Sequence, residues 1–368
     1  MGSTGRTGRK AIQTTPLRKS PVQRRATLAD VARECGLDKS TISKALNMPA
    51  AEFALAESTR QRIMESVRRL GYRPSRRAQA LARGETRVIG LVYHQATPPS
   101  GVYTSVQYAL SRILGLSGYT LQFFNIGEDP HRWSEMLYGQ QIDGVVAISA
   151  LPRAFGDMLV ESRLPAVLMN LDLDVPVDHV MMDDAAGAEL ATRHLLELGH
   201  RRIAFFGDAK NDPACRVHFS YFVRLRAYEA VMQAAGLEPY ELYGKEGTSR
   251  LVDELIARGT TAVVAFSHIT AIHLLHVAWQ RGLAVPGDLS VVSFNEEFPV
   301  AVTIPPLTTV TTVGPEMGRV AADLLLRRIK EWKAAAESDA SVEVAASQRV
   351  VLPEQLIVRG STAPARKT

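Results

Sequence analysis

The feature that most constrains the fold is an alternation of short apolar runs with longer amphipathic segments, which continues from Val88 nearly to the end of the 368-residue chain. Strands that alternate with helices in this way form a parallel sheet with helices on both faces. The alternation is long enough for two such sheets, so we predict an α/β body. The segments are Val88–Tyr93, Val102–Leu116, Thr120–Asn125, Gly144–Ile148, Ala166–Asn170, Ala185–Leu198, Arg202–Phe206, Arg224–Ala235, Ala262–Phe266, Thr270–Arg281, Ser290–Phe294 and Met317–Lys330.

Residues 26–71 show only helical periodicity. Thr27 occupies an N-cap position, and the helix after it would end at Gly36. A second helix over Lys39–Leu46 follows after a tight turn, and a third is predicted over Thr59–Leu70. Two short helices with this spacing are typical of a helix-turn-helix unit.

The segments on either side of this unit have a different composition. Residues 1–25 are rich in Gly, Ser, Thr, Pro and basic side chains without apolar periodicity, which predicts a disordered basic arm. The arm either contacts phosphates or is simply a solvated tail, and both interpretations stay open. After the unit, Ser75 can cap a short helix over Arg76–Ala82, which Gly84 would close.

Basic side chains are concentrated in the N-terminal part of the chain. Residues 1–87 carry 19 Lys and Arg against 7 Asp and Glu, a net charge of +12, whereas the remaining residues carry 24 against 31, a net charge of −7. A basic head on a mildly acidic body indicates that the head meets a polyanion and the body does not. Charge alone does not identify this polyanion as DNA.

The composition and the short motifs exclude several other classes. Cys35 and Cys215 have neither CxxC nor Cys/His spacing, so neither a disulfide framework nor a zinc site is predicted. No apolar run has the length of a signal-peptide core or a membrane span, which predicts a cytoplasmic protein. The GxGxxG, GxxxxGKS/T, GxSxG and HExxH motifs are absent, so we expect no enzyme, no catalytic residue and no cofactor.

Three histidines close in sequence, His268, His273 and His276, invite a metal interpretation. Two of them share a helical face, but no third ligand stands at a suitable spacing. We therefore interpret them as core or partly exposed histidines and predict no metal site.

Several motifs follow one another along the chain in a set order. The head contains ATLADVARECGLDKSTISKALN and then STRQRIMESVRRLGYRPSRRAQALARGETRVIGLV. The body contains VMMDDAAGAELATRHLLELGHRRIAFFGD, VPGDLSVVSFNEE, IPPLTTV and VLPEQLIVRGST. With these motifs in this order, the sequence resembles the LacI/GalR family of bacterial transcription regulators from Ala26 to Thr362.

The resemblance implies a small all-helical helix-turn-helix head and two Rossmann-like subdomains of the periplasmic-binding-protein type. The N-terminal subdomain should take residues 88–182 and a return near 297–320. Asp183 and Asp184, inside VMMDDAAG, should be structural residues near the start of a helix. The implied parts are a DNA-binding domain at 26–71, a hinge helix and linker at 72–87, an effector-binding and dimerisation core at 88–362 and a tail at 363–368.

The resemblance also implies a function. The chain would be a sequence-specific regulator, a repressor, that binds a near-palindromic operator as a homodimer and takes a small-molecule effector in the cleft between its subdomains. A sugar, a sugar phosphate and an organic acid are the effector classes considered. The alternatives are a regulator with a degenerate pocket, constitutive or controlled by a protein partner, and a soluble sugar-binding protein. Whether the effector induces or co-represses, and whether dimers pair into tetramers, stays open.

In a helix-turn-helix the second helix lies in the major groove with its N-terminal residues at the base edges. The resemblance therefore assigns base contacts to Lys39, Ser40, Ser43 and Lys44, of which lysine can donate to guanine O6 and N7. The same lysines could instead belong to a solvated helix face. By the same resemblance, phosphate contacts fall to Thr27, Thr41 and Asn47, and Leu28 and Ser75 complete the DNA-binding set.

The hinge carries the most distinctive expectation. Ala78 and Leu81 match family positions that enter the minor groove, where the leucines of two subunits wedge apart a central base step and kink the duplex. A leucine that packs the linker onto the core is the alternative. The sequence departs from the family in Met48–Ala56, which is longer than usual, and Ala56 stands where a serine cap is preferred.

The resemblance places effector contacts at Asn170, Arg224, Ser267, His268 and Asn295. Arginine is kept at the family's position, but Ser267-His268 stand for the usual Asn-Asp, and amides stand at Asn170 and Asn295 where aspartate is common. The loss of these acceptors predicts an anionic effector rather than a neutral sugar. Glu296 and Glu297 argue against it if they face the cleft, and His268 could simply cap or pack a helix.

Overall fold

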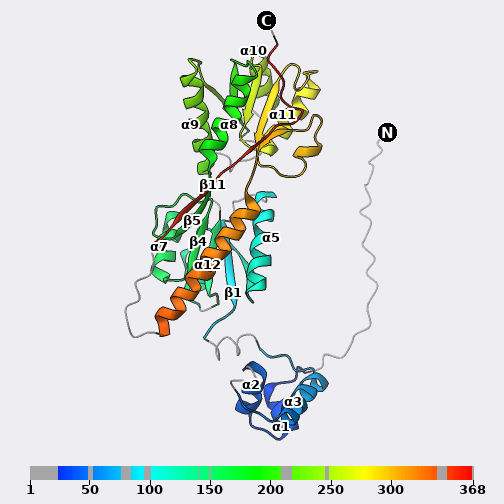
Figure 1. The fold of residues 1–368 in the computed structure, drawn as a ribbon, viewed down its shortest axis with the longest axis vertical. Helices are drawn as coiled ribbons and strands as arrows, with labels where there is room; N and C mark the ends of the chain where they lie inside the picture. The colour runs from blue at the N-terminus through cyan, green and yellow to red at the C-terminus, as the bar shows by residue number, and fades with distance from the viewer. Residues whose placement is uncertain are drawn as a thin grey trace, which may run out of the picture. The chain divides into compact units, whose positions relative to one another are not determined.

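The computed structural model describes residues 24–48, 53–75, 84–94, 101–139, 141–148, 151–208, 218–244, 248–337 and 346–366. The chain divides after Gly84 into a helical head and a larger body, and each is described by itself (Figure 1). The predicted hinge residues Ala78 and Leu81, and most of the predicted arm, lie outside the described residues.

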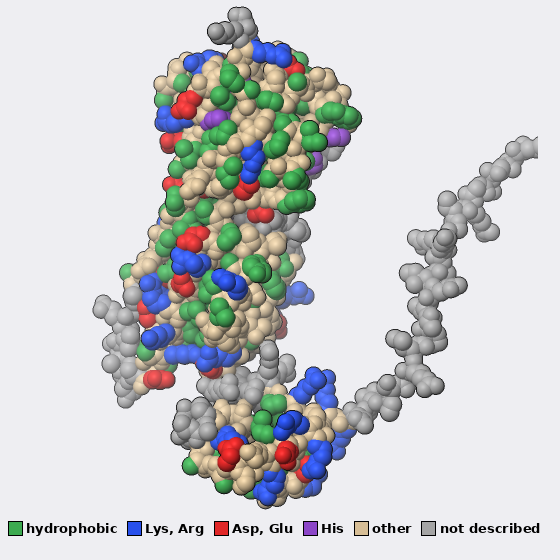
Figure 2. Space-filling model, turned by 45° about the vertical axis from the view of Figure 1, so that its right-hand side comes forward, with side chains coloured by type: hydrophobic (Ala, Val, Ile, Leu, Met, Phe, Trp, Pro, Cys, Tyr) green, Lys and Arg blue, Asp and Glu red, His purple; other side chains and the backbone are tan. Residues whose placement is uncertain are grey.

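The described residues of the head form three helices, α1 (Leu28–Cys35), α2 (Lys39–Asn47) and α3 (Glu57–Leu70). Thr27 caps α1 as predicted, in a capping box that Asp30 completes. Gly36 ends α1 in the left-handed conformation with φ 63°. Figure 2 shows Lys and Arg side chains over the visible face of the head, with fewer Asp and Glu side chains among them.

The start of α3 differs from the prediction at the place where the sequence lacks the family's serine cap. The helix begins at Glu57, two residues before the predicted start, and Ala56 in the N-cap position makes no side-chain hydrogen bond. The three helices enclose a small core whose buried side chains come from α1, α2 and α3. These side chains are Val31, Ala32, Cys35, Ile42, Ala45 and Ile63.

Where the structure describes the body, its strands form two six-stranded sheets, and we call the part around each sheet a lobe. Lobe one has the strand order β11-β5-β4-β3-β1-β2, and lobe two has β12-β10-β9-β8-β6-β7. The pairings among the described strands are parallel, as predicted, except that of β10 with β12, which is antiparallel. The strands of lobe one are β1 (Val88–His94), β2 (Thr120–Ile126), β3 (Gly144–Ile148), β4 (Ala166–Met169), β5 (Asp178–Met182) and β11 (Arg349–Leu352). Those of lobe two are β6 (Ile203–Asp208), β7 (Tyr240–Gly244), β8 (Ala262–Ala265), β9 (Ser290–Phe294), β10 (Thr308–Val310) and β12 (Leu356–Ile357).

Helices cover both faces of each sheet, which is why the strands read as nearly continuous apolar runs. In lobe one, alternate side chains of β3 and β4 face two different cores, one closed by α5 and α12 and the other by α6 and α7. In lobe two, α8 and α9 cover one face and α10 and α11 the other. The helices are α5 (Gly101–Leu116), α6 (Pro130–Tyr138), α7 (Arg153–Ser162), α8 (Asp184–Glu197), α9 (Phe219–Ala234), α10 (Thr248–Ala257), α11 (His268–Gln280), α12 (Gly314–Glu337) and the 3₁₀ turn η1 (Val300–Val302). No described helix is long and apolar enough to cross a membrane.

The chain crosses between the lobes three times, after β5, after β10 and after β11. The predicted return near 297–320 is therefore wrong in its bounds. Residues 297–310 stay in lobe two because β10 pairs with β9, whereas α12 and β11 belong to lobe one. The apolar face of α12, which includes Met317, Ala321 and Leu325, completes the core of lobe one.

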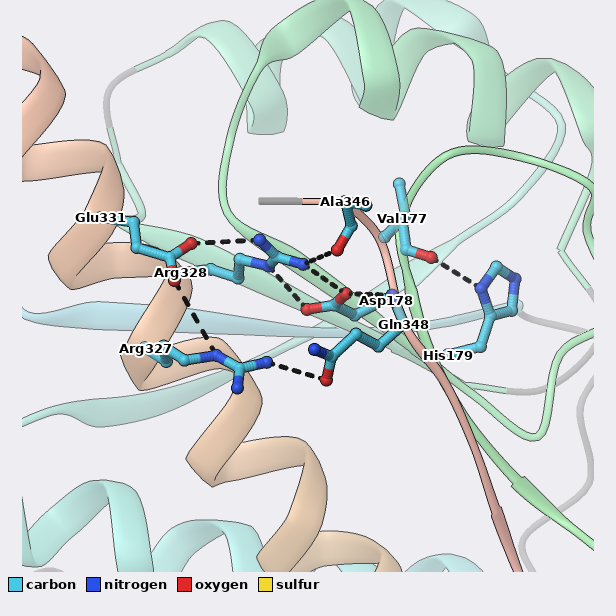
Figure 3. Close-up of polar contacts among 8 residues, drawn as sticks. All are labelled: Val177, Asp178, His179, Arg327, Arg328, Glu331, Ala346 and Gln348. Carbon is cyan, nitrogen blue, oxygen red and sulfur yellow. Dashed lines mark hydrogen bonds and ion pairs between the residues drawn. The ribbon is translucent and has the colours of Figure 1, made fainter. Parts of the chain in front are cut away.

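A buried ion pair fixes α12 to the sheet of lobe one. Arg328 of α12 donates through Nε and Nη2 to the two carboxylate oxygens of Asp178 on β5, each at 2.8 Å (Figure 3). The same carboxylate accepts from the amide of Gln348, and Arg328 also donates to the carbonyl oxygen of Ala346. One guanidinium thus joins α12, β5 and the segment that leads into β11.

Candidate DNA-binding and effector sites

Helix α2 presents the polar side chains that the sequence assigned to base contacts. Lys39, Ser40 and Lys44 are exposed, while Thr41 and Ser43 are half-buried. They face outward because the apolar side chains of the same helix, such as Ile42, fill the core of the head. Asp38 caps the helix and accepts from the amide of Thr41 at 2.8 Å.

Carboxylates orient the hydroxyl groups of this surface. Ser40 and Thr41 donate to the two oxygens of Asp38 at 2.6 and 2.5 Å, and Thr27 donates to Asp30 at 2.7 Å. These hydrogen bonds hold the pKa of both aspartates below the usual range, so both stay charged. The hydroxyl protons of Thr27, Ser40 and Thr41 therefore point to carboxylates. The two cations of α2 are Lys39 at its first residue and Lys44 in its last turn.

The loop after α2 supports the recognition helix, a role that sequence reasoning missed. The Lys44 ammonium lies 5.8 Å from the ring centroid of Phe53, within cation–π range. Arg60 of α3 donates to the carbonyl oxygens of Ala45 and Phe53 at 3.1 and 3.2 Å. The longer loop is thereby tied to both α2 and α3, and the aromatic residue inside it was the available signal.

Of the remaining predicted DNA-binding residues, the structure describes three, Leu28, Asn47 and Ser75. Leu28 is half-buried and packs against the core of the head, and Asn47 donates to Ser43 Oγ at 3.4 Å. Ser75 is exposed at the end of the described part of the head. Ala78 and Leu81 lie outside the described residues, so their expected place in the minor groove stays a prediction.

Four of the five predicted effector residues gather at the carboxyl ends of the strands of lobe two. Arg224 lies on α9, Ser267 and His268 follow β8, and Asn295 follows β9. Arg224 Nη1 donates to the carbonyl oxygen of Phe266, the residue before Ser267, at 2.9 Å. Its guanidinium also lies 4.0 Å from the ring centroid of Phe294, the residue before Asn295. Open α/β sheets bind their ligands at this edge.

Arg224 already has a charged partner. Its Nε and Nη2 lie 2.7 and 2.6 Å from Asp184 Oδ1, and Ser220 donates to Oδ2 of the same carboxylate at 2.6 Å. Both charged side chains are almost fully buried. The predicted structural role holds for Asp183, which caps α8 by accepting from the amide of Ala186. The pairing of Asp184 with Arg224 was not predicted from the sequence. The available signal was the motif VMMDDAAG, which contains Asp184.

Asn170 belongs to the other lobe. It follows β4 with φ 44°, and its buried Oδ1 has no hydrogen-bond partner among the described residues. Asn295 also has a positive φ, 72°, a conformation that asparagine tolerates better than most residues. An asparagine thus directly follows one strand in each lobe, Asn170 after β4 and Asn295 after β9.

Ser267 and His268 have local structural roles. Ser267 caps α11 by accepting from the amide of Thr270 at 3.2 Å, and His268 is buried in the first turn of that helix. The described part of the chain contains no group of three or more His, Cys, Asp or Glu side chains placed to hold a metal ion.

Acidic side chains flank the same strand ends. Glu296 binds Arg359, whose Nη1 lies 2.9 Å from Glu296 Oε2. Burial, together with the charge of Glu296, raises the pKa of Glu297, while a hydrogen bond with Thr312 opposes this rise. The two arginines described at this edge, Arg224 and Arg359, are each paired with a carboxylate.

Two family models match the chain. The model of bacterial regulatory proteins of the lacI family matches residues 27–75, and that of the periplasmic binding protein-like domain matches residues 192–362. The HTH-type transcriptional regulator MalR of Streptomyces coelicolor is 31% identical over 352 residues, which cover 92% of this chain and 97% of MalR.

Solved structures give the same result for the fold. The lac repressor dimer bound to operator and the anti-inducer ONPF superposes with a TM-score of 0.76 at 20% identity, over 92% of this chain and all of that one. The complex of the transcriptional regulator CelR with cellobiose has a TM-score of 0.62 at 27% identity with the same coverage. The chain therefore belongs to the LacI family of bacterial regulatory proteins, which are DNA-binding transcriptional regulators and not enzymes.

Proposed function

We propose that the chain is a repressor that binds a near-palindromic operator as a homodimer and responds to a small molecule held at the carboxyl ends of the strands of its two lobes. The observation that carries the proposal is α2, a capped helix that presents Lys39 at its first residue and Lys44 in its last turn from a folded head. The similarity of the chain's fold to the lac repressor dimer bound to operator supports the arrangement of two copies on DNA.

Within this proposal each contact has a chemical role. Lys39 and Lys44 donate to base edges, and Ser40 and Ser43 read sequence more weakly because a hydroxyl suits several bases. Helix ends and polar side chains fix the register on the backbone without reading sequence. The residues proposed for the backbone and hinge are Thr27, Leu28, Thr41, Asn47, Ser75, Ala78 and Leu81.

The test is capture of genomic DNA fragments by the full-length protein in competition with non-specific DNA. We expect a shared near-palindromic site, bound less tightly by Leu81→Ala and as tightly by Leu116→Ala, a matched change at an exposed leucine of the body. Sequence-independent binding that vanishes at moderate salt would reject the proposal, because only the basic charge would then act.

For the effector we propose a neutral, hydroxyl-bearing molecule. Asp184 neutralises Arg224, and Arg359 is bound to Glu296, so an anion would find no free positive charge on these two groups. Hydroxyl groups suit the amides of Asn170 and Asn295, which both donate and accept. The proposal replaces the anionic effector that the exchanged residues predict, and the sugar bound to CelR supports it.

Thermal unfolding of the full chain with cellobiose, ribose, glucose 6-phosphate and citrate separates the two classes. We expect stabilisation by a neutral sugar, lost in Asn295→Ala and kept in Gln233→Ala, which removes an exposed amide side chain in the last turn of α9. A response to glucose 6-phosphate or citrate alone would reject the neutral effector and restore the anionic one. A chain that binds operator DNA and responds to no small molecule would instead support control by a protein partner.

A further inference from the structure

One buried carboxyl group lies where the crossing segments of the body meet. Glu354 stands between β11 and β12 in the third crossing, and the residue is 5% exposed. Neither of its carboxylate oxygens has a hydrogen-bond partner among the described residues. A buried carboxylate without partners is costly, so the group must either be neutral or gain a partner.

The packing around Glu354 leaves no room for a larger neighbour. A methyl group built on Gly187, in the first part of α8, would collide with Glu354 Oε2 and come within 3.0 Å of Val310 on β10. The carboxyl therefore lies between α8 and the end of β10, and glycine at position 187 makes its place possible.

The charges that face Glu354 do not offset its burial. Asp183 and Asp184 face it from α8 and Arg224 from α9, while β10 presents the apolar Val310. Burial raises the pKa of Glu354 to about 8, against the charge of Arg224 and with the help of the two aspartates. Because Arg224 is bound to Asp184, it is not free to pair with Glu354.

Hydrogen bonds hold the third crossing to the other two. The amide of Asp183 in the first crossing donates to the carbonyl oxygen of Leu352 at 3.0 Å. The amide of Thr311 in the second crossing donates to the carbonyl oxygen of Gln355 at 2.8 Å, and the amide of Gln355 donates back to Thr311 Oγ1 at 2.9 Å. Glu354 thus sits between two residues that are fixed to the neighbouring crossings.

We propose that Glu354 is a proton-binding residue of the lobe junction, protonated while the crossings are packed around it and ionised when their separation lets water reach it. In the opening step the carboxyl O–H bond breaks, the proton passes to water, and the carboxylate becomes hydrated. The inference depends neither on the DNA target nor on the identity of the effector. Any ligand that changes the junction would then change the number of bound protons, which makes its affinity depend on pH.

The sign follows from the two protonation states. The packed junction binds the proton more tightly than the open one, so rising pH favours opening, by up to about tenfold per pH unit between the usual pKa of a glutamate and about 8. Above that range both states are ionised and the effect ends.

Hydrogen exchange of the full chain tests this. The amides of Asp183, Thr311 and Gln355, corrected for the intrinsic exchange rate at each pH, should lose protection as pH rises in the wild-type protein. They should keep it in Glu354→Gln, because glutamine has the shape of the protonated acid and does not titrate. Glu316→Gln, an exposed carboxyl on α12, is the matched control and should behave as wild type.

Infrared spectroscopy supplies a second readout. At neutral pH the wild-type protein should show the carbonyl stretch of a protonated carboxylic acid, which is lost in Glu354→Gln and kept in Glu316→Gln. The same band in Glu354→Gln, or an unchanged pH dependence of exchange at the junction amides, would overturn the proposal. If Glu354→Gln does not fold, Glu354→Met, which fills a similar volume without a titrating group, replaces it in both measurements.

Discussion

At the scale of single residues, the two lysines of α2 differ in how they are held. Lys39 is exposed next to the helix cap, whereas Lys44 lies over the ring of Phe53. A cation fixed before binding loses less freedom when it meets a base, which favours Lys44 as the more specific of the two contacts.

We therefore expect Lys44→Ala to weaken operator binding more than binding to random DNA. The loss of a good base contact costs about 1–3 kcal/mol, which is roughly five- to 150-fold in affinity. Fluorescence anisotropy with the selected operator and with a scrambled duplex measures both affinities, and Lys330→Ala on the exposed surface of α12 is the control. Equal losses on the two duplexes would assign Lys44 to the backbone.

The site residues also differ in how far sequence could predict them. The exposed residues of α2 were found because a helix-turn-helix has a fixed spacing between its helices. Asp184 and Glu354 were not identified as partners or neighbours of Arg224, because they reach it through separate crossings between the lobes. No local sequence pattern indicates that these three residues are neighbours in the folded chain.

At the scale of elements, long periodic segments were predicted better than short ones. The helices of the head were placed within two residues, and Thr27, Gly36 and Gly71 mark their ends by their own chemistry. In contrast, β12 contains only Leu356 and Ile357 and exists because it pairs with β10. Short strands of this kind depend on tertiary pairing, which the sequence does not display.

The uncapped start of α3 gives a prediction at this scale. Ala56→Ser or Ala56→Asp should stabilise the head by about 0.5–2 kcal/mol, because a side-chain oxygen would accept from a free amide of the first turn. Chemical unfolding of the full chain, followed by a probe in the head, measures the gain. Ala54→Ser, the same change two residues before the N-cap position, should have no such effect, and a gain there of equal size would contradict the capping explanation.

The clamp between α12 and β5 predicts a dependence on acid. Burial opposes ionisation of Asp178, but the hydrogen bonds from Arg328 and from the amide of Gln348 outweigh it and lower the pKa of Asp178 below the usual value. A carboxyl group with a lowered pKa in the folded state stabilises the fold fully above its usual pKa, and this contribution is lost as pH falls through the folded value.

Asp178→Asn should consequently destabilise the body at neutral pH by about 3–5 kcal/mol, because it leaves Arg328 buried without its charged partner. The difference from wild type should shrink as the pH falls below about 4. Urea unfolding across this range measures it. Glu316→Gln, which breaks an exposed pair with Arg319, should cost only about 0–1 kcal/mol at any pH, and a loss as large as that of Asp178→Asn would refute the importance of burial.

At the scale of the whole molecule, charge is divided between the two ends of the chain. The 19 basic and 7 acidic side chains of residues 1–87 contrast with the net charge of −7 over the remainder. Binding to DNA should therefore depend steeply on salt, with the head as its source.

Titrations at several salt concentrations test this division. Replacing one phosphate-binding lysine or arginine should lower the slope of log K against log salt by about 1. We expect this for Arg25→Ala, which removes an exposed cation just before α1, and an unchanged slope for Lys330→Ala in the body. A slope that changes equally in both variants would show that the body also meets the DNA.

The three crossings also have a consequence for how the protein folds while it is being synthesised. Lobe one is assembled from residues 88–182 together with α12 and β11, so its sheet lacks its edge strand and one face of its core stays uncovered until Leu352 has left the ribosome. The head consists of local contacts and can fold as soon as it is synthesised. A nascent chain halted before α12 would therefore carry a folded head on an unfinished body, exposed to chaperones and proteases.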